Sequence, residues 1–368
     1  MPRLLSIVVP TYKRQELIPR QIEFWSNEPH DLIILDGSPN QWEPPKSLTT
    51  TDGEVRFRYV HRPTPIEERL RFSISLIETP FVALLSDDEF FIPSALGECV
   101  EFLKANPDYA SCKGGAVGFR VQDGQPQLRR VYKNLPGLRI EADDGRERMR
   151  RHLSPYAMAS LWSVQQRKIY EACVKSLGNP PFESAAAPEV AISLINAYLG
   201  KIVVLNSVMW LRSYEYKNIW WQAGPISFDQ WWLKADPNEA ARFVLGIQNA
   251  CGEVGESQPA TSDIHGALNE YCRQQNLVKR VTRRQVMKRT NVLDSVVLVL
   301  KVFLQKYVKA FRLGQGRKSA RTAKWRSVVS VLDDLEADGI AVDRDQVILA
   351  LDFVQMWHHS NDISVSHH

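Results

Sequence analysis

The sequence predicts an α/β fold in which helices cover a sheet of parallel strands. Short apolar runs alternate with segments of helical periodicity, as expected for strands joined by helical crossovers. Two of these runs, 4–9 and 81–85, then break abruptly into polar residues: Pro10-Thr11 after the first, and the acids Asp87, Asp88 and Glu89 after the second. In an open α/β sheet, ligands bind at the carboxyl edge of the strands, so these polar residues mark a candidate site.

The expected elements follow in chain order. Strands are predicted at 4–9, 31–35, 56–60 and 81–85, with helices at 15–25, 66–77 and 94–105. A β pattern from 109 to 132 contains a turn at Asp123-Gly124. A second α/β stretch comprises 156–164, helices at 166–177 and 189–199, and strands at 201–205 and 208–212. The pattern is mostly helical after Tyr216, which predicts an α/β domain over 1–215 and an α-helical C-terminal domain over 216–368.

The composition is that of an ordinary soluble globular protein, with 24% charged and 44% hydrophobic residues among 368. Its five cysteines are scattered without a CxxC pair, which favours reduced thiols over a disulfide framework or a zinc site. The first residues lack the features of a secretory leader, and no apolar run reaches the roughly 18 residues that a spanning helix needs. The sequence therefore predicts a cytoplasmic protein.

Positive charge is concentrated between residues 279 and 326, where 15 Lys and Arg stand against the single acid Asp294. An apolar-rich stretch at 291–311 lies within this segment. Such a segment suits peripheral contact with an anionic inner membrane face, which would bring the site to a lipid-linked acceptor. A packed helix with a solvated basic face explains the pattern equally well. Nucleic acid is the least favoured partner, because no nucleic-acid-binding signature accompanies the charge.

Three motifs in order resemble family 2 glycosyltransferases of the GT-A fold, and the segments 59–63, 68–70 and 107–109 with the acidic triplet resemble an uncharacterised bacterial branch of that family. The three motifs are VVPTYKR near the N-terminus, LIILDGS at 32–38 and LLSDDEF at 84–90. The resemblance covers roughly residues 4–215. It implies a GT-A type, Rossmann-like mixed sheet flanked by helices, and the transfer of a sugar from a nucleoside-diphosphate sugar to a glycan or lipid-linked acceptor.

The resemblance also implies which residues bind the nucleotide. Pro10 and Thr11 would face the base or ribose, and Asp36 would accept the imino proton of uracil, which favours a UDP-type donor. Arg69 would face the phosphates, with Arg71 as its rival. Apart from the resemblance, Arg212 ends a predicted strand near the same edge and would contact the diphosphate. Each has an ordinary alternative, because Asp36-Gly37-Ser38 is also a turn sequence and the arginines also suit solvated surfaces.

The acidic triplet is the expected metal site. Hard carboxylate oxygens suit Mn²⁺ or Mg²⁺, which would bridge the diphosphate of the donor. Asp88 is the expected direct ligand, while Asp87 would contact ribose or a metal-bound water. The usual DxD pattern is altered here, since Leu85 stands at its first acidic position. An acidic helix N-terminus is the alternative explanation.

The catalytic base of an inverting transfer is a carboxylate that takes the proton of the acceptor hydroxyl. In the resembled family, an acidic pair opens a helix that ends before a Gly-Lys-Ile-like strand start. Here Gly200-Lys201-Ile202 sets the register and places Glu189 at the position of the base, with Glu183 as the runner-up. The first acid of the pair is missing.

Two other classes of protein remain open. A nucleotidyltransferase of related fold also holds a metal and a nucleotide with acids, although the glycine-rich loop that it normally carries after the first strand is missing here. A catalytically degenerate scaffold that binds glycan or membrane is favoured by Leu35, Leu85 and the lost acid. Nucleotide binding in the presence of metal would separate these classes.

Overall fold

The structure is a computed structural model that describes residues 3–43, 57–216, 226–255, 257–287 and 324–361. Its strands are β1 (Leu5–Thr11), β2 (Asp31–Asp36), β3 (Phe57–His61), β4 (Phe81–Leu84), β5 (Phe90–Phe91), β6 (Tyr109–Gln122), β7 (Gln125–Arg130), β8 (Arg139–Ile140), β9 (Val164–Gln166), β10 (Lys201–Ser213) and β11 (Arg326–Ser327). Its helices are η1 (Gln15–Leu17), α1 (Ile18–Trp25), α2 (Ile66–Ser73), α3 (Pro93–Ala105), α4 (Gly145–Leu153), α5 (Arg167–Lys175), α6 (Ala187–Leu199), α7 (Phe228–Trp232), α8 (Pro237–Val254), α9 (Thr261–Met287), α11 (Val328–Ala337) and α12 (Arg344–Asn361).

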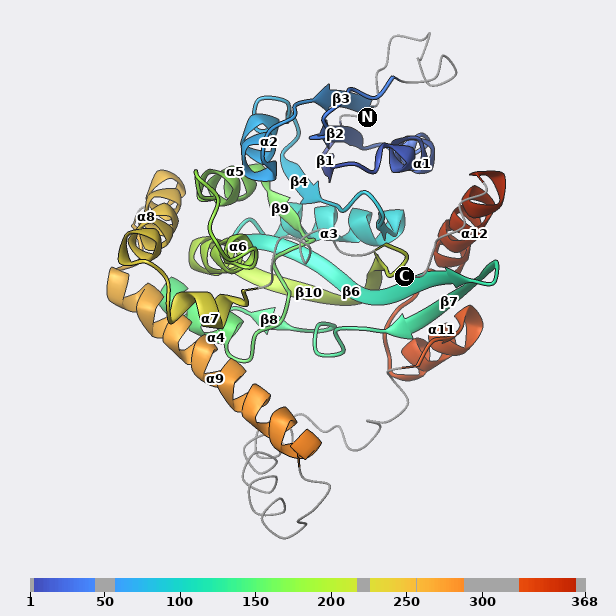
Figure 1. The fold of residues 1–368 in the computed structure, drawn as a ribbon. Coiled ribbons are helices and arrows are strands. Elements are labelled where there is room, and N and C mark those ends of the chain that lie inside the picture. The colour runs from blue at the N-terminus through green and yellow to red at the C-terminus, as the bar shows by residue number, and fades with distance from the viewer. Residues whose placement is uncertain (1–2, 44–56, 217–225, 256, 288–323, 362–368) are drawn as a thin grey trace.

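The described strands form one mixed sheet, with β3, β2, β1 and β4 parallel along one half. The other half combines the parallel pair β6 and β10 with the antiparallel strands β7 and β9. The predicted fold class, a mixed α/β sheet flanked by helices with further helices toward the C-terminus, is therefore confirmed (Figure 1).

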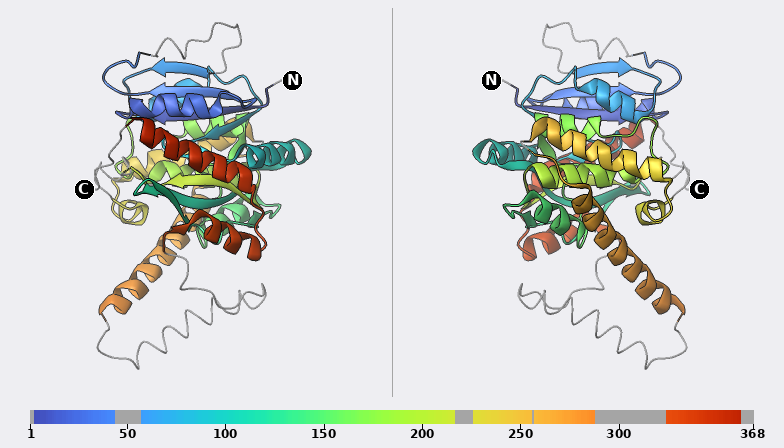
Figure 2. Two further views of the ribbon diagram at one scale, coloured as in Figure 1. Left: turned by 90° about the vertical axis from the view of Figure 1, so that its right-hand side faces the viewer. Right: turned by 90° about the vertical axis from the view of Figure 1, so that its left-hand side faces the viewer.

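Helices cover both faces of the sheet, because its strands are apolar on both sides. On β1, Ile7 and Val9 belong to one buried cluster, while Val8 between them belongs to the other. The first cluster includes residues of α1, α3, α11 and α12, and the second includes residues of α2, α5, α6 and α8. Figure 2 shows α12 crossing one side of the molecule and α8 lying on the other.

Three local expectations differ from the structure. The stretches 201–205 and 208–212 form the single strand β10, which continues through register irregularities against β6. Of the stretch 156–164, only Val164 is in a strand, because β9 starts there. Helix α4 was not expected: its polar sequence has few apolar positions, and Met149 and Leu153 carry its buried contacts.

The predicted domain boundary at residue 215 stays a prediction. Segments beyond it contribute to both buried clusters, and β11 pairs with β7. Most of the predicted basic segment, residues 288–323, lies outside the described residues. Within the described part of the chain, no helix has the length and apolar character needed to cross a membrane. All five cysteines are buried, and no disulfide bond joins any two of them.

A buried ion pair fastens the C-terminal helix to the α/β core. Arg20 of α1 is fully buried, and its Nη1 lies 3.4 Å from Oε2 of Glu215, just beyond β10. The other carboxylate oxygen lies 2.6 Å from Nε2 of His358 on α12. Glu215 therefore joins α1, β10 and α12 at one point.

We expect Glu215→Gln to destabilise the protein by about 3–5 kcal/mol, because it leaves the buried Arg20 guanidinium without its carboxylate. The measurement is equilibrium unfolding in urea. Glu78→Gln is the matched control: it removes the carboxylate of the exposed pair with Arg58 and should leave the free energy of unfolding nearly unchanged. If the two substitutions lowered the free energy of unfolding equally, the buried ion pair would contribute no more to stability than the exposed one.

Candidate nucleotide-sugar and catalytic site

Four parallel strands bring the predicted nucleotide residues to one edge of the sheet. Thr11, the last residue of β1, pairs with Asp36, the last residue of β2. On the other side of β1, Val8 pairs with Leu84, after which the chain enters the acidic triplet. The backbone N–H of Leu85 donates to the carbonyl of Val8 at 2.9 Å and so holds the start of this loop against β1.

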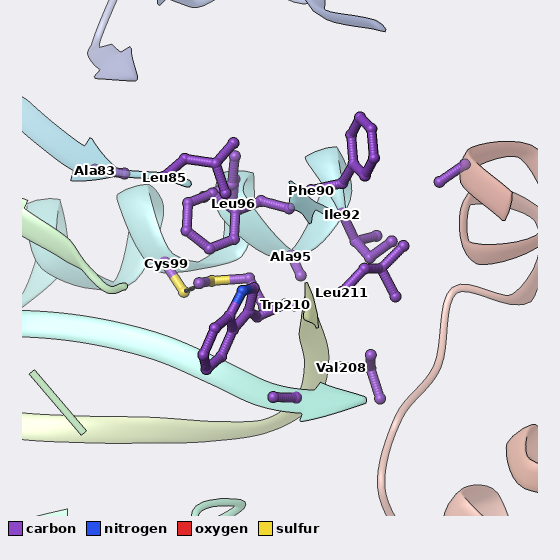
Figure 3. Packing of buried hydrophobic residues seen from close by; sticks show 14 of the residues in the cluster. Ala83, Leu85, Phe90, Ile92, Ala95, Leu96, Cys99, Val208, Trp210 and Leu211 are labelled. Carbon is purple, nitrogen blue, oxygen red and sulfur yellow. Dashed lines mark hydrogen bonds between the residues drawn. The ribbon is translucent and has the colours of Figure 1, made fainter. Parts of the chain in front are cut away.

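Buried side chains before and after the acidic triplet in the chain fix the triplet in position. Leu85 before it and Phe90 after it are fully buried. Figure 3 shows these two side chains packing with Leu96 of α3, while Trp210 of β10 lies below the same helix. The short strand β5 also pairs with β10. The three acids are thus held on a rigid support between β4 and α3.

Arg14 neutralises much of the negative charge of the triplet. Its guanidinium forms an ion pair with Asp87 and lies 3.3 Å from Oδ2 of Asp88. The Thr11 hydroxyl also donates to Asp87, at 2.7 Å. Burial raises the pKa of Asp87 to about 7, although the Arg14 charge opposes this shift, and the Asp88 charge adds to it. Both oxygens of Asp87 are occupied by these partners.

Asp36 is fully buried at the end of β2 and accepts three hydrogen bonds. The donors are the Ser38 backbone N–H at 2.8 Å, the Gln15 amide at 2.6 Å and the Tyr59 hydroxyl at 2.8 Å. Burial alone would raise the Asp36 pKa, but these bonds outweigh it and hold the pKa below its ordinary value. The Ser38 hydroxyl interacts with the same carboxylate, so the roughly four acceptor positions of Asp36 are engaged within the protein.

Arg69 lies beneath the loop that follows β2. Its Nη1 donates to the carbonyl oxygens of Thr11 at 2.7 Å and Leu35 at 2.6 Å, and Nε donates to Thr64 at 3.1 Å. A Cβ at Gly37 would lie only 2.5 Å from Cζ of Arg69, so glycine is needed there for the close approach. Arg69 thus shapes the strand ends directly, and its contact with phosphates stays a prediction. Arg71 instead donates to the carbonyl of Leu177.

Glu89, the third acid, points into the protein core. Its Oε2 accepts a hydrogen bond from the Trp210 indole at 2.8 Å, and burial raises its pKa well above the ordinary value. Lys113 of β6 lies 4.8 Å from the Trp210 ring and donates to the carbonyls of Met158 and Leu161. Burial lowers the pKa of Lys113 to about 7 against the opposing charges of Glu89 and, more weakly, Glu189.

The two candidate bases occupy different surroundings. Glu189 lies in the first turn of α6, where its carboxylate accepts a hydrogen bond from the Tyr156 hydroxyl. Burial raises the pKa of Glu189, while the bond from Tyr156 and the Lys113 charge lower it to a smaller extent. Glu183 is exposed in the loop before α6. Since Lys113 interacts with both Glu89 and Glu189, it links the acidic triplet to the predicted base.

The remaining predicted contacts lie at neighbouring strand ends. Pro10 is partly exposed next to Thr11 and pairs with Leu35 of β2. Arg212 near the end of β10 is partly exposed and donates to the Tyr132 hydroxyl. The guanidinium carbon of Arg212 lies 5.8 Å from the centre of the Trp210 ring, and the Trp210 indole donates to Glu89.

The chemistry of the donor set suits a metal held by one carboxylate. In the described part of the chain, no group of three or more His, Cys, Asp or Glu is arranged to hold a metal ion. Mg²⁺-type sites, however, commonly use one or two carboxylates and complete their shell with substrate phosphates and water. Arg14 approaches Oδ2 of Asp88 only at 3.3 Å, and Oδ1 accepts a hydrogen bond from the Ser86 hydroxyl at 2.7 Å. Asp88 fits this role better than Asp87, because Asp87 is bound by both Arg14 and Thr11.

Several functional residues escaped the sequence analysis. Arg14 ends the VVPTYKR motif, and the signal for it was weak, because Lys13 beside it carries the same charge. Tyr59 and Gln15 bind Asp36 from β3 and η1. Lys113 gave no signal, because a lysine within a β pattern is ordinarily assigned to the exposed face.

Comparison with known proteins supports glycosyl transfer as the activity. Residues 6–164 match a family model described as glycosyl transferase family 2, so the family resemblance is confirmed over the segment that contains the strand ends and the acidic triplet. No curated protein matches the chain in sequence.

Similar solved structures include glycosyltransferases from two organisms. A crystal structure of TarS 1-349 from S. aureus is 12% identical with a TM-score of 0.44, and the match covers 79% of this chain and 95% of that chain. A complex of the same TarS segment with UDP-GlcNAc is 11% identical with a TM-score of 0.40, at the same coverage. The mannosyltransferase PcManGT from Pyrobaculum calidifontis, in complex with GDP-Man and Mn²⁺, is 13% identical with a TM-score of 0.41, over 85% of this chain and 82% of that chain.

Proposed function

We propose that this chain transfers a sugar from a nucleoside-diphosphate sugar to an acceptor hydroxyl, with inversion at the anomeric carbon. The observation that carries the proposal is that Thr11, Asp36 and the Asp87-Asp88 pair meet at one sheet edge within the segment that matches glycosyl transferase family 2. A transfer with inversion requires the nucleotide to leave from one face of the sugar while a general base acts on the acceptor hydroxyl at the opposite face.

The nucleotide lies along the ends of β1 and β2. Asp36 binds the imino group of a uracil-type base in exchange for one of its present donors, and Thr11 and Pro10 flank the ribose. Arg69 keeps the two strand ends together through their carbonyl oxygens. Asp88 holds Mn²⁺ or Mg²⁺, which when bound neutralises the charge of the diphosphate.

Glu189 is the general base of the proposed reaction. The oxygen of the acceptor hydroxyl bonds to the anomeric carbon as the bond from that carbon to the diphosphate oxygen breaks. The hydroxyl proton passes to the Glu189 carboxylate, and the nucleoside diphosphate leaves with the bonding electron pair. Tyr156 orients the carboxylate through its hydrogen bond, and Arg14 holds Asp87 and Asp88 in place.

A nucleotide-binding scaffold without turnover is the second candidate. The observation that favours it is the pairing of Arg14 with both aspartates, since this cation compensates the acids without any metal. The two candidates differ in whether a metal is needed for nucleotide binding and in whether sugar is transferred.

Thermal unfolding with UDP or GDP tests the nucleotide site. We expect the melting temperature to rise with UDP only when Mn²⁺ or Mg²⁺ is present, since ligand at a hundredfold excess over its dissociation constant adds about 2.7 kcal/mol to stability. Metal alone is the control. An equal shift with and without metal would refute the metal role, and no shift with either nucleotide would refute the donor site.

A further inference from the structure

Beside the acidic triplet, the sheet carries a row of arginines interleaved with aromatic rings. Arg212 of β10 pairs with Gly118 of β6, which pairs with Arg129 of β7, so the two arginines flank one glycine across three strands. Residues that pair directly in a sheet project from the same face. We call this surface the Arg–aromatic ladder; its partly exposed members are Arg120, Arg129, Arg212, Tyr132, Tyr214 and Trp325.

The ladder is tightly stacked. The guanidinium carbon of Arg129 lies 3.7 Å from the centre of the Tyr214 ring and 4.7 Å from that of Trp325. Arg120 lies 4.5 Å from the Trp325 ring, and Arg212 lies 5.2 Å from the Tyr214 ring. A Cβ at position 118 would come within 2.7 Å of the Tyr214 ring, so Gly118 makes room for the stack.

The three arginines carry positive charge that the described residues do not neutralise. Among those residues, no carboxylate forms an ion pair with Arg120, Arg129 or Arg212, although most other arginines of the sheet have such a partner. Arg120 donates to the Gln127 amide and Arg212 to the Tyr132 hydroxyl. The buried Nε of Arg129 has no hydrogen-bond partner. Stacking on rings holds the guanidinium groups in place while leaving donors free.

The ladder leads directly to the proposed catalytic centre. The Tyr132 ring stacks on Trp210 with centroids 5.6 Å apart and an angle of 12° between planes. Trp210 in turn donates to Glu89, the residue next to Asp88. Arg212 lies over both Tyr132 and Trp210. Trp210 and Glu89 are both buried, so this contact connects the ladder with the support of the acidic triplet through the core.

We propose that the Arg–aromatic ladder binds the acceptor, and that this acceptor is a glycan bearing carboxylate or phosphate groups. This inference rests on the proposed function. Guanidinium groups bind carboxylate and phosphate through paired hydrogen bonds, and their charge is matched only by an anionic ligand. Tyr132, Tyr214 and Trp325 are partly exposed, so a sugar chain bound along the ladder also contacts aromatic side chains, which a simple inorganic anion would not need.

Direct binding to defined polymers tests this proposal without requiring turnover. The probes are oligogalacturonate, its neutral methyl ester, phosphorylated dextran, plain dextran and a thymidine oligonucleotide. We expect an anionic glycan to bind more tightly than its neutral counterpart, with affinity that falls as salt rises. The comparison of oligogalacturonate with phosphorylated dextran identifies which anionic group is preferred.

The matched variants are Arg120→Gln/Arg129→Gln on the ladder and Arg58→Gln/Arg146→Gln elsewhere on the surface. Both remove two positive charges, but only the first should weaken glycan binding by about tenfold or more, because it removes charge-assisted hydrogen bonds. Arg129→Lys keeps the positive charge but loses the planar guanidinium, so it should bind the anionic glycan with intermediate affinity. This variant replaces the double variant in the test if the double variant fails to fold.

The shift in melting temperature that UDP produces with Mn²⁺ separates the ladder proposal from the proposed function. It should be unchanged in the ladder variants, and its absence in the parent protein would count against the donor site, not against the ladder. The proposal would be overturned if neutral and anionic glycans bound equally well, or if the oligonucleotide bound more tightly than any glycan. It would also be overturned if both double variants lost the same amount of glycan affinity. Failure of every polymer to bind would overturn it as well.

Discussion

Asp88→Asn should abolish the metal-dependent part of nucleotide binding while leaving the fold intact. Asparagine has nearly the same shape, so it can keep the hydrogen bond with the Ser86 hydroxyl that now lies 2.7 Å from Oδ1. It loses the negative charge that Mn²⁺ or Mg²⁺ requires. Because loss of an outer partner of a metal ligand alone typically costs 10–100-fold in metal affinity, loss of the ligand itself should weaken metal-dependent UDP binding by at least about 10²-fold.

The measurement is isothermal titration of UDP in the presence of Mn²⁺, with thermal unfolding as a check on folding. Asp31→Asn is the matched control, because Asp31 begins β2 at the opposite edge of the sheet, where it pairs with Arg3 at the surface. UDP binding as tight in Asp88→Asn as in the control would exclude Asp88 as a metal ligand. It would favour a scaffold in which Arg14 alone compensates the acids.

Local sequence signals were sufficient to predict the parallel half of the sheet. Residues 31–35 and 81–85 are apolar throughout or nearly so, and helical periodicity separates them, so their pairing with β1 follows from general rules for α/β folds. The same rules place Asp36 and the acidic triplet at one edge. The convergence of these acids was therefore predictable without any knowledge of side-chain contacts.

Long-range contacts were not predictable in this way. The partner of Arg20 lies 195 residues away in sequence, and the Glu215–His358 contact spans 143 residues. No periodicity in one segment specifies which distant segment covers it. The Arg–aromatic ladder has the same origin, since Trp325 joins Arg120 and Arg129 only because β11 pairs with β7.

The compensation of the acidic triplet illustrates the limit most clearly. Three consecutive acids would repel one another unless a cation or solvent compensates them, and their hard carboxylate oxygens favoured a metal ion. The structure supplies Arg14, 73 residues before Asp87, as one such cation. The need to compensate the negative charge was therefore predictable from the residues, whereas the group that compensates it depends on tertiary structure.

Glu189→Gln should lower kcat by about 10²-fold or more and leave UDP binding nearly unchanged, because loss of a general base typically costs that much. Burial raises the pKa of Glu189, so the base is protonated, and inactive, at a higher pH than an ordinary glutamate. In the parent protein kcat should therefore fall as pH falls through this raised pKa, and in Glu189→Gln this dependence should disappear. Product formation from UDP-sugar at several pH values measures both effects.

Glu183→Gln is the matched control, because it alters an exposed side chain of the same type, and it should retain full activity. The reverse result, with Glu183→Gln inactive and Glu189→Gln active, would assign the general base to the loop before α6.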